Sequence, residues 1–162
     1  MTIKEYPQHK LAAQPIGFWS REAADLVIGG LRTALAEEDL TQPHWWSLNH
    51  IAGAPGHWTR ATLTEKLTPY DDQDTDFDAV YADLASRGWI AETDATLTLT
   101  EEGEAGRLRA RDRNAEVHAR MRVGIDDAAY AATIDALRRI VANLGGDGDL
   151  PEYRGASTDG QH

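Results

Sequence analysis

The sequence contains no cysteine, which excludes a disulfide framework and a thiolate metal site. Its apolar stretches are far shorter than the ~18 apolar residues of a membrane-spanning helix, and no apolar signal segment follows Met1. We therefore expect a soluble, cytoplasmic protein that does not interact with a membrane. Hydrophobic residues make up 41% of the 162 residues, which is enough for one folded domain with its own core.

Basic residues are also scarce, because 16 lysines and arginines face 27 aspartates and glutamates, for a net charge of −11. The acidity is concentrated between residues 71 and 106, where eleven acidic side chains and a single base, Arg87, leave a net charge of −10. The remaining 16 acids and 15 bases nearly cancel. Such an excess of acid is unusual for a nucleic-acid-binding protein, since contacts with phosphate groups need Lys and Arg.

The clearest local pattern lies in residues 74–100, DTDFDAVYADLASRGWIAETDATLTLT. Its first part has apolar residues at spacings of three and four between Phe77 and Leu84, which predicts an amphipathic helix over residues 74–87. Asp74 or Thr75 is the expected N-cap, and Gly88 suits the left-handed position that ends a helix.

A small β-hairpin is predicted after this helix. Residues 89–91 form the first expected strand, and residues 96–100 alternate Thr and Leu as a half-buried strand does. Residues 92–95 connect the two as a turn. A helix, an Arg-Gly pair, a strand, a turn and a second strand that leads into another helix form the order of a winged helix-turn-helix.

Three segments resemble the multiple-antibiotic-resistance regulator (MarR) family: LTQPHWWSLNHIAG at 40–53, LASRGWI at 84–90 and LTLTEEGEA at 97–105. The resemblance extends over roughly residues 16–144. It implies a mainly α fold in which a winged helix-turn-helix head with a small β-hairpin wing is flanked by N- and C-terminal dimerisation helices. It also implies a homodimer with interlocked first and last helices, acting as a ligand-responsive transcriptional regulator on double-stranded DNA.

The expected organisation is one structural domain with four parts. These are an N-terminal arm at 1–15, a helical dimerisation region at 16–40 and 101–144, the winged helix-turn-helix at 41–100 and a flexible tail at 145–162. Apart from the 74–87 helix, we expect helices from a cap at Ser20 to about residue 38, after Thr41, over 59–67, over about 101–123, and from a cap at Asp126 or Asp127 to about residue 144.

Two glycines, Gly29 and Gly30, fall in the middle of the first of these helices. Each costs about 1 kcal/mol of helix stability relative to Ala, so a compensating interaction is expected. A close helix approach at a dimer interface is one explanation, and a kink in the helix is the other.

The resemblance places the 74–87 helix in the major groove of DNA. The residues predicted to contact DNA, with basic side chains from the preceding helix, are Arg60, Lys66, Asp76, Ala79, Asp83, Ser86 and Arg87. An Asp can accept a hydrogen bond from cytosine N4, whereas a row of Asp repels phosphate. The wing, residues 92–96, also lacks the Arg that family members insert into the minor groove. The residues of this segment alone therefore favour a solvated acidic face over a helix that contacts DNA.

Aromatic residues and histidines cluster between residues 18 and 58, which include four of the five Trp. The resemblance implies that a small phenolic or aromatic ligand binds between the dimerisation helices and the head. The residues predicted to line this site are Phe18, Trp19, Trp46, His50, Arg113, His118 and Met121. The alternative is that these aromatic residues belong to the core, which is favoured for Trp45 and remains an even choice for Trp46 and His50.

No motif indicates metal binding or catalysis. The histidines at 44, 50, 57 and 118 include no pair four residues apart, and DDQDTDFD lacks the glycine and closing Glu of an EF-hand. There is no serine elbow and no phosphate loop, so we predict no catalytic residues, no metal and no cofactor. A second hypothesis remains: a winged-helix scaffold that has lost DNA binding and binds or transforms a small aromatic molecule, with a histidine such as His50 as general base.

Overall fold

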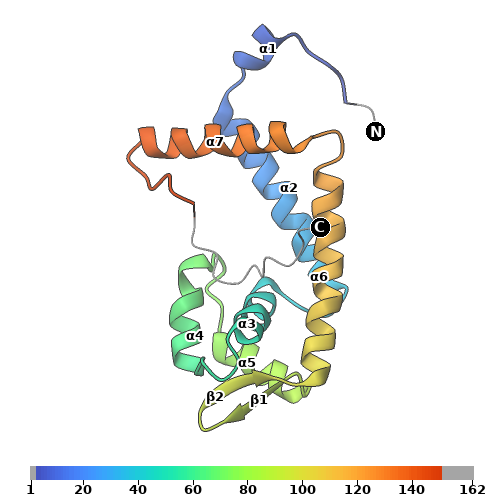
Figure 1. The fold of residues 1–162 in the computed structure, drawn as a ribbon, viewed down its shortest axis with the longest axis vertical. Helices are drawn as coiled ribbons and strands as arrows, with labels where there is room; N and C mark the ends of the chain where they lie inside the picture. Colours follow the sequence, from blue (N-terminus) through green and yellow to red (C-terminus); the bar gives the residue numbers. More distant parts are fainter. Residues whose placement is uncertain (1–2, 151–162) are drawn as a thin grey trace.

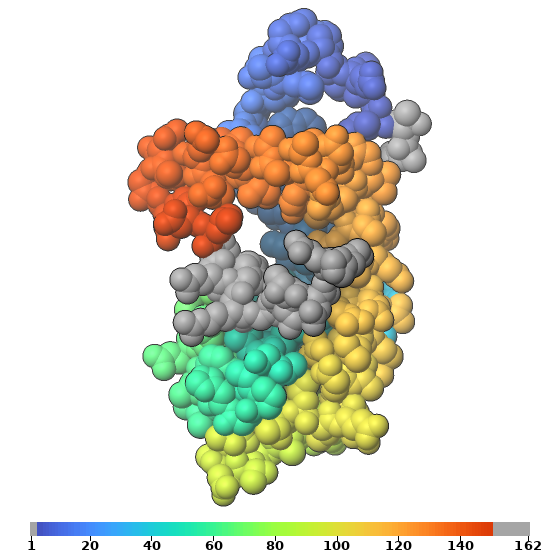
Figure 2. Space-filling view, in the orientation of Figure 1, coloured from blue at the N-terminus to red at the C-terminus, as the bar shows by residue number. Residues whose placement is uncertain are grey.

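A computed structural model describes residues 3–150, and its helices and single hairpin confirm the predicted mainly α class with a small β wing (Figure 1). The elements are α1 (Gln8–Ala12), α2 (Ile16–Ala36), α3 (Gln42–Gly53), α4 (Arg60–Leu67), the 3-10 helix η1 (Thr68–Tyr70), α5 (Phe77–Ser86), β1 (Ile90–Thr93), β2 (Thr96–Leu99), α6 (Glu101–Met121) and α7 (Asp127–Asn143). In the space-filling view the wing forms one end of the molecule, while α7 and the N-terminal residues form the other (Figure 2).

The head is built on α3, α4 and α5, which enclose one hydrophobic core. Its fully buried side chains are Leu48, Ile51, Leu63, Leu67, Tyr81, Leu84 and Leu97. Those in the helices lie three or four residues apart, so each helix buries one face, and Leu97 adds to the core from β2. Thr41 occupies the N-cap position of α3, as the sequence predicts, and Thr59, predicted as the first residue of the next helix, is the N-cap of α4.

Helix α5 begins later than predicted, and its N-cap is neither Asp74 nor Thr75. Asp76 is the cap, because its Oδ1 accepts a hydrogen bond from the Ala79 N–H at 3.1 Å. Thr75 is already engaged, since its N–H and its hydroxyl both donate to the Asp71 carboxylate, at 2.6 and 2.8 Å. Asp74 has a positive φ of 54°, a conformation outside the helix.

The wing is a two-stranded antiparallel hairpin in which Ile90 pairs with Leu99 and Thr93 with Thr96. The predicted strand at 89–91 is therefore shifted, and the turn is shorter than predicted. Asp94 and Ala95 form it, and their φ values of 51° and 63° are those of a two-residue hairpin turn.

Trp89 lies outside the strand because it packs against two glycines of α6. A Cβ at Gly103 would lie 1.9 Å from the Trp89 carbonyl oxygen, and one at Gly106 would lie 2.4 Å from the indole ring. Only glycine allows such an approach at these positions. Gly103 and Gly106 thus form a notch in α6 that holds Trp89 and attaches the start of the wing to α6.

The long helices α2 and α6 pack against each other above the head (Figure 1). Helix α2 starts at Ile16 rather than at the predicted cap Ser20, because Pro15 can occupy the N-cap without losing a needed N–H. The helix continues through both glycines. A Cβ at Gly30 would lie 3.2 Å from Val117 Cγ1, so Gly30 approaches α6 of the same chain, while nothing lies within 4 Å of a Cβ at Gly29.

Helix α7, which lies at the end of the molecule opposite the wing, buries no residue of its own (Figure 1). It is capped by Asp126, whose Oδ1 accepts from the Ala129 N–H at 2.7 Å. Large apolar side chains remain exposed in this region, namely Ile16, Phe18, Trp19, Leu26, Val123, Ile125, Val141 and Leu144. A single chain therefore leaves an extended apolar surface over α2 and α7 uncovered.

The N-terminal end of the chain differs from the predicted irregular arm. Gln8–Ala12 forms the short helix α1 where an irregular segment was predicted. Residues 145–150 return to α7, where the Arg138 Nε–H donates to the Gly148 carbonyl at 2.6 Å, and residues 151–162 of the predicted tail lie outside the described residues. Within residues 3–150, no helix has both the length and the apolar character needed to cross a membrane.

Candidate nucleic-acid interface and ligand cleft

The outward face of α5 carries mostly small side chains. Phe77, Val80, Tyr81 and Leu84 are buried in the head, which leaves an exposed surface made of Asp78, Ala79, Ala82, Ala85 and Ser86. Ala79 and Ser86 were predicted as contact residues, whereas Ala82 and Ala85 were not. Their three-residue spacing from Ala79 is the signal that could have identified them. Alanine methyl groups can contact thymine methyl groups in the major groove.

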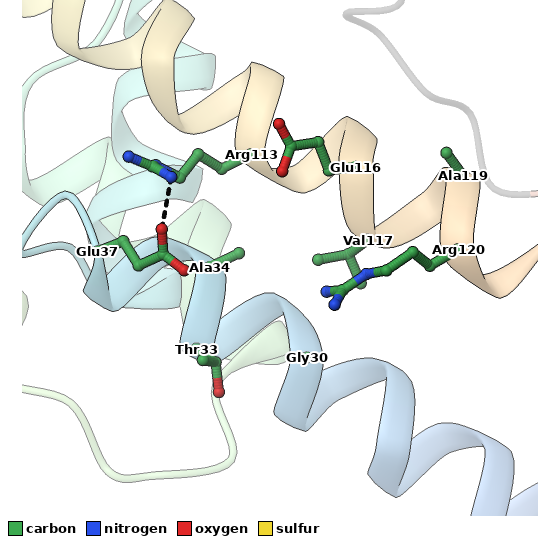
Figure 3. A pocket seen from close by; sticks show the side chains of 9 residues that line it. All are labelled: Gly30, Thr33, Ala34, Glu37, Arg113, Glu116, Val117, Ala119 and Arg120. Atoms are coloured by element: carbon green, nitrogen blue, oxygen red, sulfur yellow. Dashed lines mark hydrogen bonds and ion pairs between the residues drawn. The ribbon is translucent and has the colours of Figure 1, made fainter.

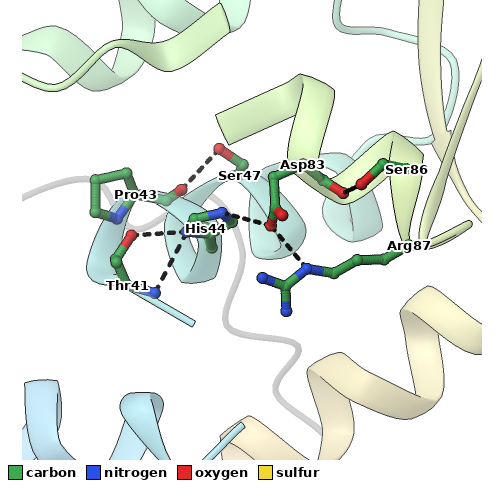
Figure 4. Close-up of polar contacts among 7 residues, drawn as sticks. All are labelled: Thr41, Pro43, His44, Ser47, Asp83, Ser86 and Arg87. Atoms are coloured by element: carbon green, nitrogen blue, oxygen red, sulfur yellow. Dashed lines mark hydrogen bonds and ion pairs between the residues drawn. The ribbon is translucent and has the colours of Figure 1, made fainter. Parts of the chain in front are cut away.

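Asp83 and Arg87 lie at the C-terminal end of α5 and form an ion pair with each other, and Asp83 also contacts His44 of α3 (Figure 4). Arg87 Nε lies 2.7 Å from Asp83 Oδ2 in an ion pair, and His44 Nε2 lies 3.1 Å from the same oxygen. The Thr41 N–H donates to His44 Nδ1 at 3.3 Å, so the imidazole proton lies on Nε2 and points to Asp83.

Burial sets the protonation of His44. Desolvation lowers the pKa of His44 below its usual value and outweighs the opposing attraction of the Asp83 carboxylate. His44 is therefore neutral at pH 7, and it connects α3 to α5 as a hydrogen-bond donor rather than as a cation.

A second ion pair connects α4 to the wing. The Arg60 Nε–H donates to Glu92 Oε2 at 3.0 Å, although 32 residues separate the two in sequence. The third predicted basic residue, Lys66, is exposed in the last turn of α4 and forms no ion pair within residues 3–150. Asp76 serves the α5 N-terminus as its cap, so its carboxylate is partly used within the helix.

Two guanidinium groups approach the Trp89 ring, because those of Arg87 and Arg109 each lie 5.8 Å from its centroid. Arg109 in turn donates to Glu38 at the end of α2, at 2.8 Å, and Arg113 donates to the other oxygen of Glu38 at 2.9 Å. These hydrogen bonds lower the pKa of the Glu38 carboxyl. A continuous set of polar contacts thus connects the end of α5 with the α2–α6 pair.

The residues predicted to bind a ligand fall into three groups, on α2, α3 and α6. Phe18 and Trp19 contact each other edge to face with ring centroids 5.2 Å apart, and each is 54% exposed on the first turn of α2. Trp46 packs against the head core, and His50 is fixed beside it because its Nδ1 lies 2.9 Å from the Trp46 carbonyl oxygen. The indole N–H of Trp58 also donates to the His50 carbonyl at 2.9 Å.

A cleft of about 660 Å³ lies between α2 and α6 (Figure 3). The residues that line it are Gly30, Thr33, Ala34, Glu37, Arg113, Glu116, Val117, Ala119 and Arg120. Of the predicted ligand-binding residues, only Arg113 belongs to this lining, while His118 and Met121 lie elsewhere on α6. Among residues 3–150, no group of three or more histidines and carboxylates is placed to hold a metal ion.

A three-helix head with a two-stranded wing, joined to two long packed helices, defines a winged helix-turn-helix protein. Solved structures share this arrangement. The PcaV transcriptional regulator from Streptomyces coelicolor has a TM-score of 0.65 at 21% identity and matches over 81% of this chain and 98% of its own. A MarR family transcriptional regulator from Silicibacter pomeroyi has a TM-score of 0.64 at 16% identity, over 86% and 99%.

A MarR family protein of Mycobacterium tuberculosis, solved in complex with DNA, has a TM-score of 0.61 at 21% identity, over 82% of this chain and 99% of its own. The same protein has been solved with salicylic acid and with p-aminosalicylic acid. No family model and no curated protein matches the sequence. The chain therefore has the fold of the MarR family regulators, which confirms at the level of the fold the resemblance found in the sequence.

Proposed function

We propose that this protein is a ligand-responsive, DNA-binding transcriptional regulator that acts as a homodimer. The observation that carries the proposal is the fold, shared over more than four fifths of the chain with MarR family regulators, one of them in complex with DNA. The fold brings α5, a capped helix with one exposed face, next to a hairpin wing. DNA-binding helix-turn-helix proteins place such a helix against the major groove.

The dimer would form through the surface that a single chain leaves uncovered. Helices α2 and α7 expose apolar side chains such as Leu26 and Leu144, which are 74% and 83% exposed. Burying such a surface against a second copy would remove apolar area from water. In this organisation, residues 16–40 and 101–144 form the dimerisation region and residues 41–100 the DNA-binding head.

DNA contact would come from the exposed face of α5 together with cations at its edges. The proposed contact residues are Arg60, Lys66, Asp76, Ala79, Ala82, Asp83, Ala85, Ser86 and Arg87. The head holds nine acidic and three basic residues between positions 41 and 100, so its phosphate contacts must be few. Recognition would then depend more on base edges and dimer geometry than on charge.

The ligand proposed is a small aromatic molecule bound between the head and the dimerisation helices. The salicylic acid complex of the Mycobacterium tuberculosis protein supports an aromatic acid as the first compound to test. The side chains proposed to contact it remain Phe18, Trp19, Trp46, His50, Arg113, His118 and Met121. Binding there would change the distance between the two α5 helices, which must lie about one DNA turn apart to contact two half-sites.

Fluorescence anisotropy of the purified protein with its own upstream DNA tests the DNA-binding part of this proposal. We expect the upstream duplex to bind at least tenfold more tightly than a scrambled duplex at ~150 mM salt. Equal binding of both duplexes at low and at near-physiological salt would contradict the proposal and favour a scaffold that works on small molecules alone. Addition of salicylate should weaken the complex, and that effect should be lost in the Trp46→Ala variant.

A further inference from the structure

Two of the three basic side chains in the head are held by carboxylates of the same head. Arg60 is bonded to Glu92 of the wing, and Arg87 is bonded to Asp83 one turn earlier in α5. The Arg60 Nε–H donates to Glu92 Oε2 at 3.0 Å, and Arg87 Nε lies 2.7 Å from Asp83 Oδ2. The cations best placed to bind phosphate are thus already occupied by intramolecular anions.

We propose that Asp83 and Glu92 are specificity-determining residues that suppress sequence-independent binding to the DNA backbone. This inference rests on the proposed DNA-binding function and adds to it the role of two acidic residues at the interface. Sequence-independent affinity comes almost entirely from contacts between cations and phosphates. A carboxylate that competes with phosphate for Arg60 or Arg87 therefore reduces binding to arbitrary DNA more than binding to a site with favourable base contacts.

The pair between Arg60 and Glu92 is suited to act as a removable competitor. Its two side chains are 35% and 39% exposed, so both water and a phosphate group can reach them. Exposed ion pairs contribute little to stability, and a well-placed phosphate can therefore displace the carboxylate.

The pair between Asp83 and Arg87 is held more firmly. Asp83 also accepts from the buried His44, and the Arg87 guanidinium lies 5.8 Å from the Trp89 ring. The ion pair with Asp83 is formed on the Nε side of Arg87, while the two terminal amino groups of the guanidinium form no ion pair within residues 3–150. An Arg fixed in this way can still bind guanine O6 and N7, whereas it has little freedom to follow phosphates at arbitrary positions.

Replacing Glu92 by glutamine tests the proposal, because the substitution removes the charge and keeps the size. Anisotropy titrations with a scrambled duplex from ~50 to ~300 mM salt measure only the backbone contribution. One additional phosphate contact by Arg60 should steepen the slope of log K against log salt by about 0.9, and it should tighten binding about tenfold at ~50 mM salt. The ratio of operator to scrambled affinity should fall, and Asp83→Asn should act in the same direction.

Two further variants separate the ion pair from net charge. Asp94→Asn makes the same change in charge two residues along the wing. Asp94 forms no ion pair within residues 3–150, and Asn tolerates the positive φ at this position. This variant should leave the salt slope unchanged. In the double variant Arg60→Gln with Glu92→Gln, the increase in affinity for the scrambled duplex should disappear.

The proposal would be overturned if Asp94→Asn increased the affinity for the scrambled duplex as much as Glu92→Gln does. It would also be overturned if the increase persisted without Arg60, or if Glu92→Gln left the affinity unchanged. Far-ultraviolet circular dichroism and thermal melting of each variant establish that the head is folded. The proposed function fails on a different result, namely equal affinity of the wild-type protein for operator and scrambled duplexes.

Discussion

Replacing Gly103 by alanine should displace Trp89 and loosen the wing from α6. The new Cβ would lie 1.9 Å from the Trp89 carbonyl oxygen and 2.7 Å from its carbonyl carbon, so backbone rather than a flexible side chain must move. Overpacking of a folded interior costs about 1–3 kcal/mol, and a clash with backbone should fall at the upper end of that range. Alanine returns about 1 kcal/mol of helix propensity, which leaves a net loss of about 2 kcal/mol.

For a chain of this length, that loss should lower the Tm by about 4–8 °C, measured by circular dichroism at a fixed protein concentration. Gly29→Ala is the matched control, because it also changes a helical glycine but meets no atom within 4 Å. It should raise the free energy of unfolding by up to about 1 kcal/mol. The reasoning is refuted if Gly103→Ala melts at or above the wild-type temperature. A stable Gly29→Ala protein that no longer dimerises would show instead that Gly29 lies at a dimer interface.

Two further predictions concern pH and assembly. The lowered pKa of His44 means that the unfolded chain binds a proton more readily than the folded one, so the free energy of unfolding should fall as the pH drops below about 6.5. Urea titrations between pH 7.5 and 5 should show this decrease of the free energy of unfolding with pH, and His44→Gln should reduce it. An unchanged pH dependence in that variant would exclude His44 as its cause. Leu26→Asp places a charge on the exposed face of α2 and should convert the dimer to a monomer in light scattering without changing the helical content. A dimer that persists in Leu26→Asp at micromolar concentration would argue against α2 as the interface.

Much of the fold follows from local patterns. The cap Thr41 and the cap at Asp126 or Asp127 were predicted because each precedes an apolar stripe at helical spacing, and the structure places Thr41 and Asp126 at N-caps. The α5 cap was mispredicted because several acids and a threonine compete between residues 71 and 76. The choice among them depends on Asp71, which takes both donors of Thr75.

The features that the sequence could not predict are those that join distant segments. Trp89 follows a predicted helix end and looks like the start of a strand, but its position is decided by the notch at Gly103 and Gly106 in α6. The pair between Arg60 and Glu92 likewise depends on how the wing lies against α4. A count of charges along the chain therefore identified an acidic head but not which acids neutralise which bases.

The central claim is that two α5 helices of a dimer contact DNA at a defined spacing. Selection of bound duplexes from a random-sequence library, followed by sequencing, tests it without knowledge of the operator. The account predicts a palindromic motif whose half-sites are centred about 10 bp apart, and its enrichment should be lost in the Arg87→Ala variant. The absence of any enriched motif, or enrichment of an unpaired single half-site by a dimeric protein, would contradict the proposal that two α5 helices bind DNA together.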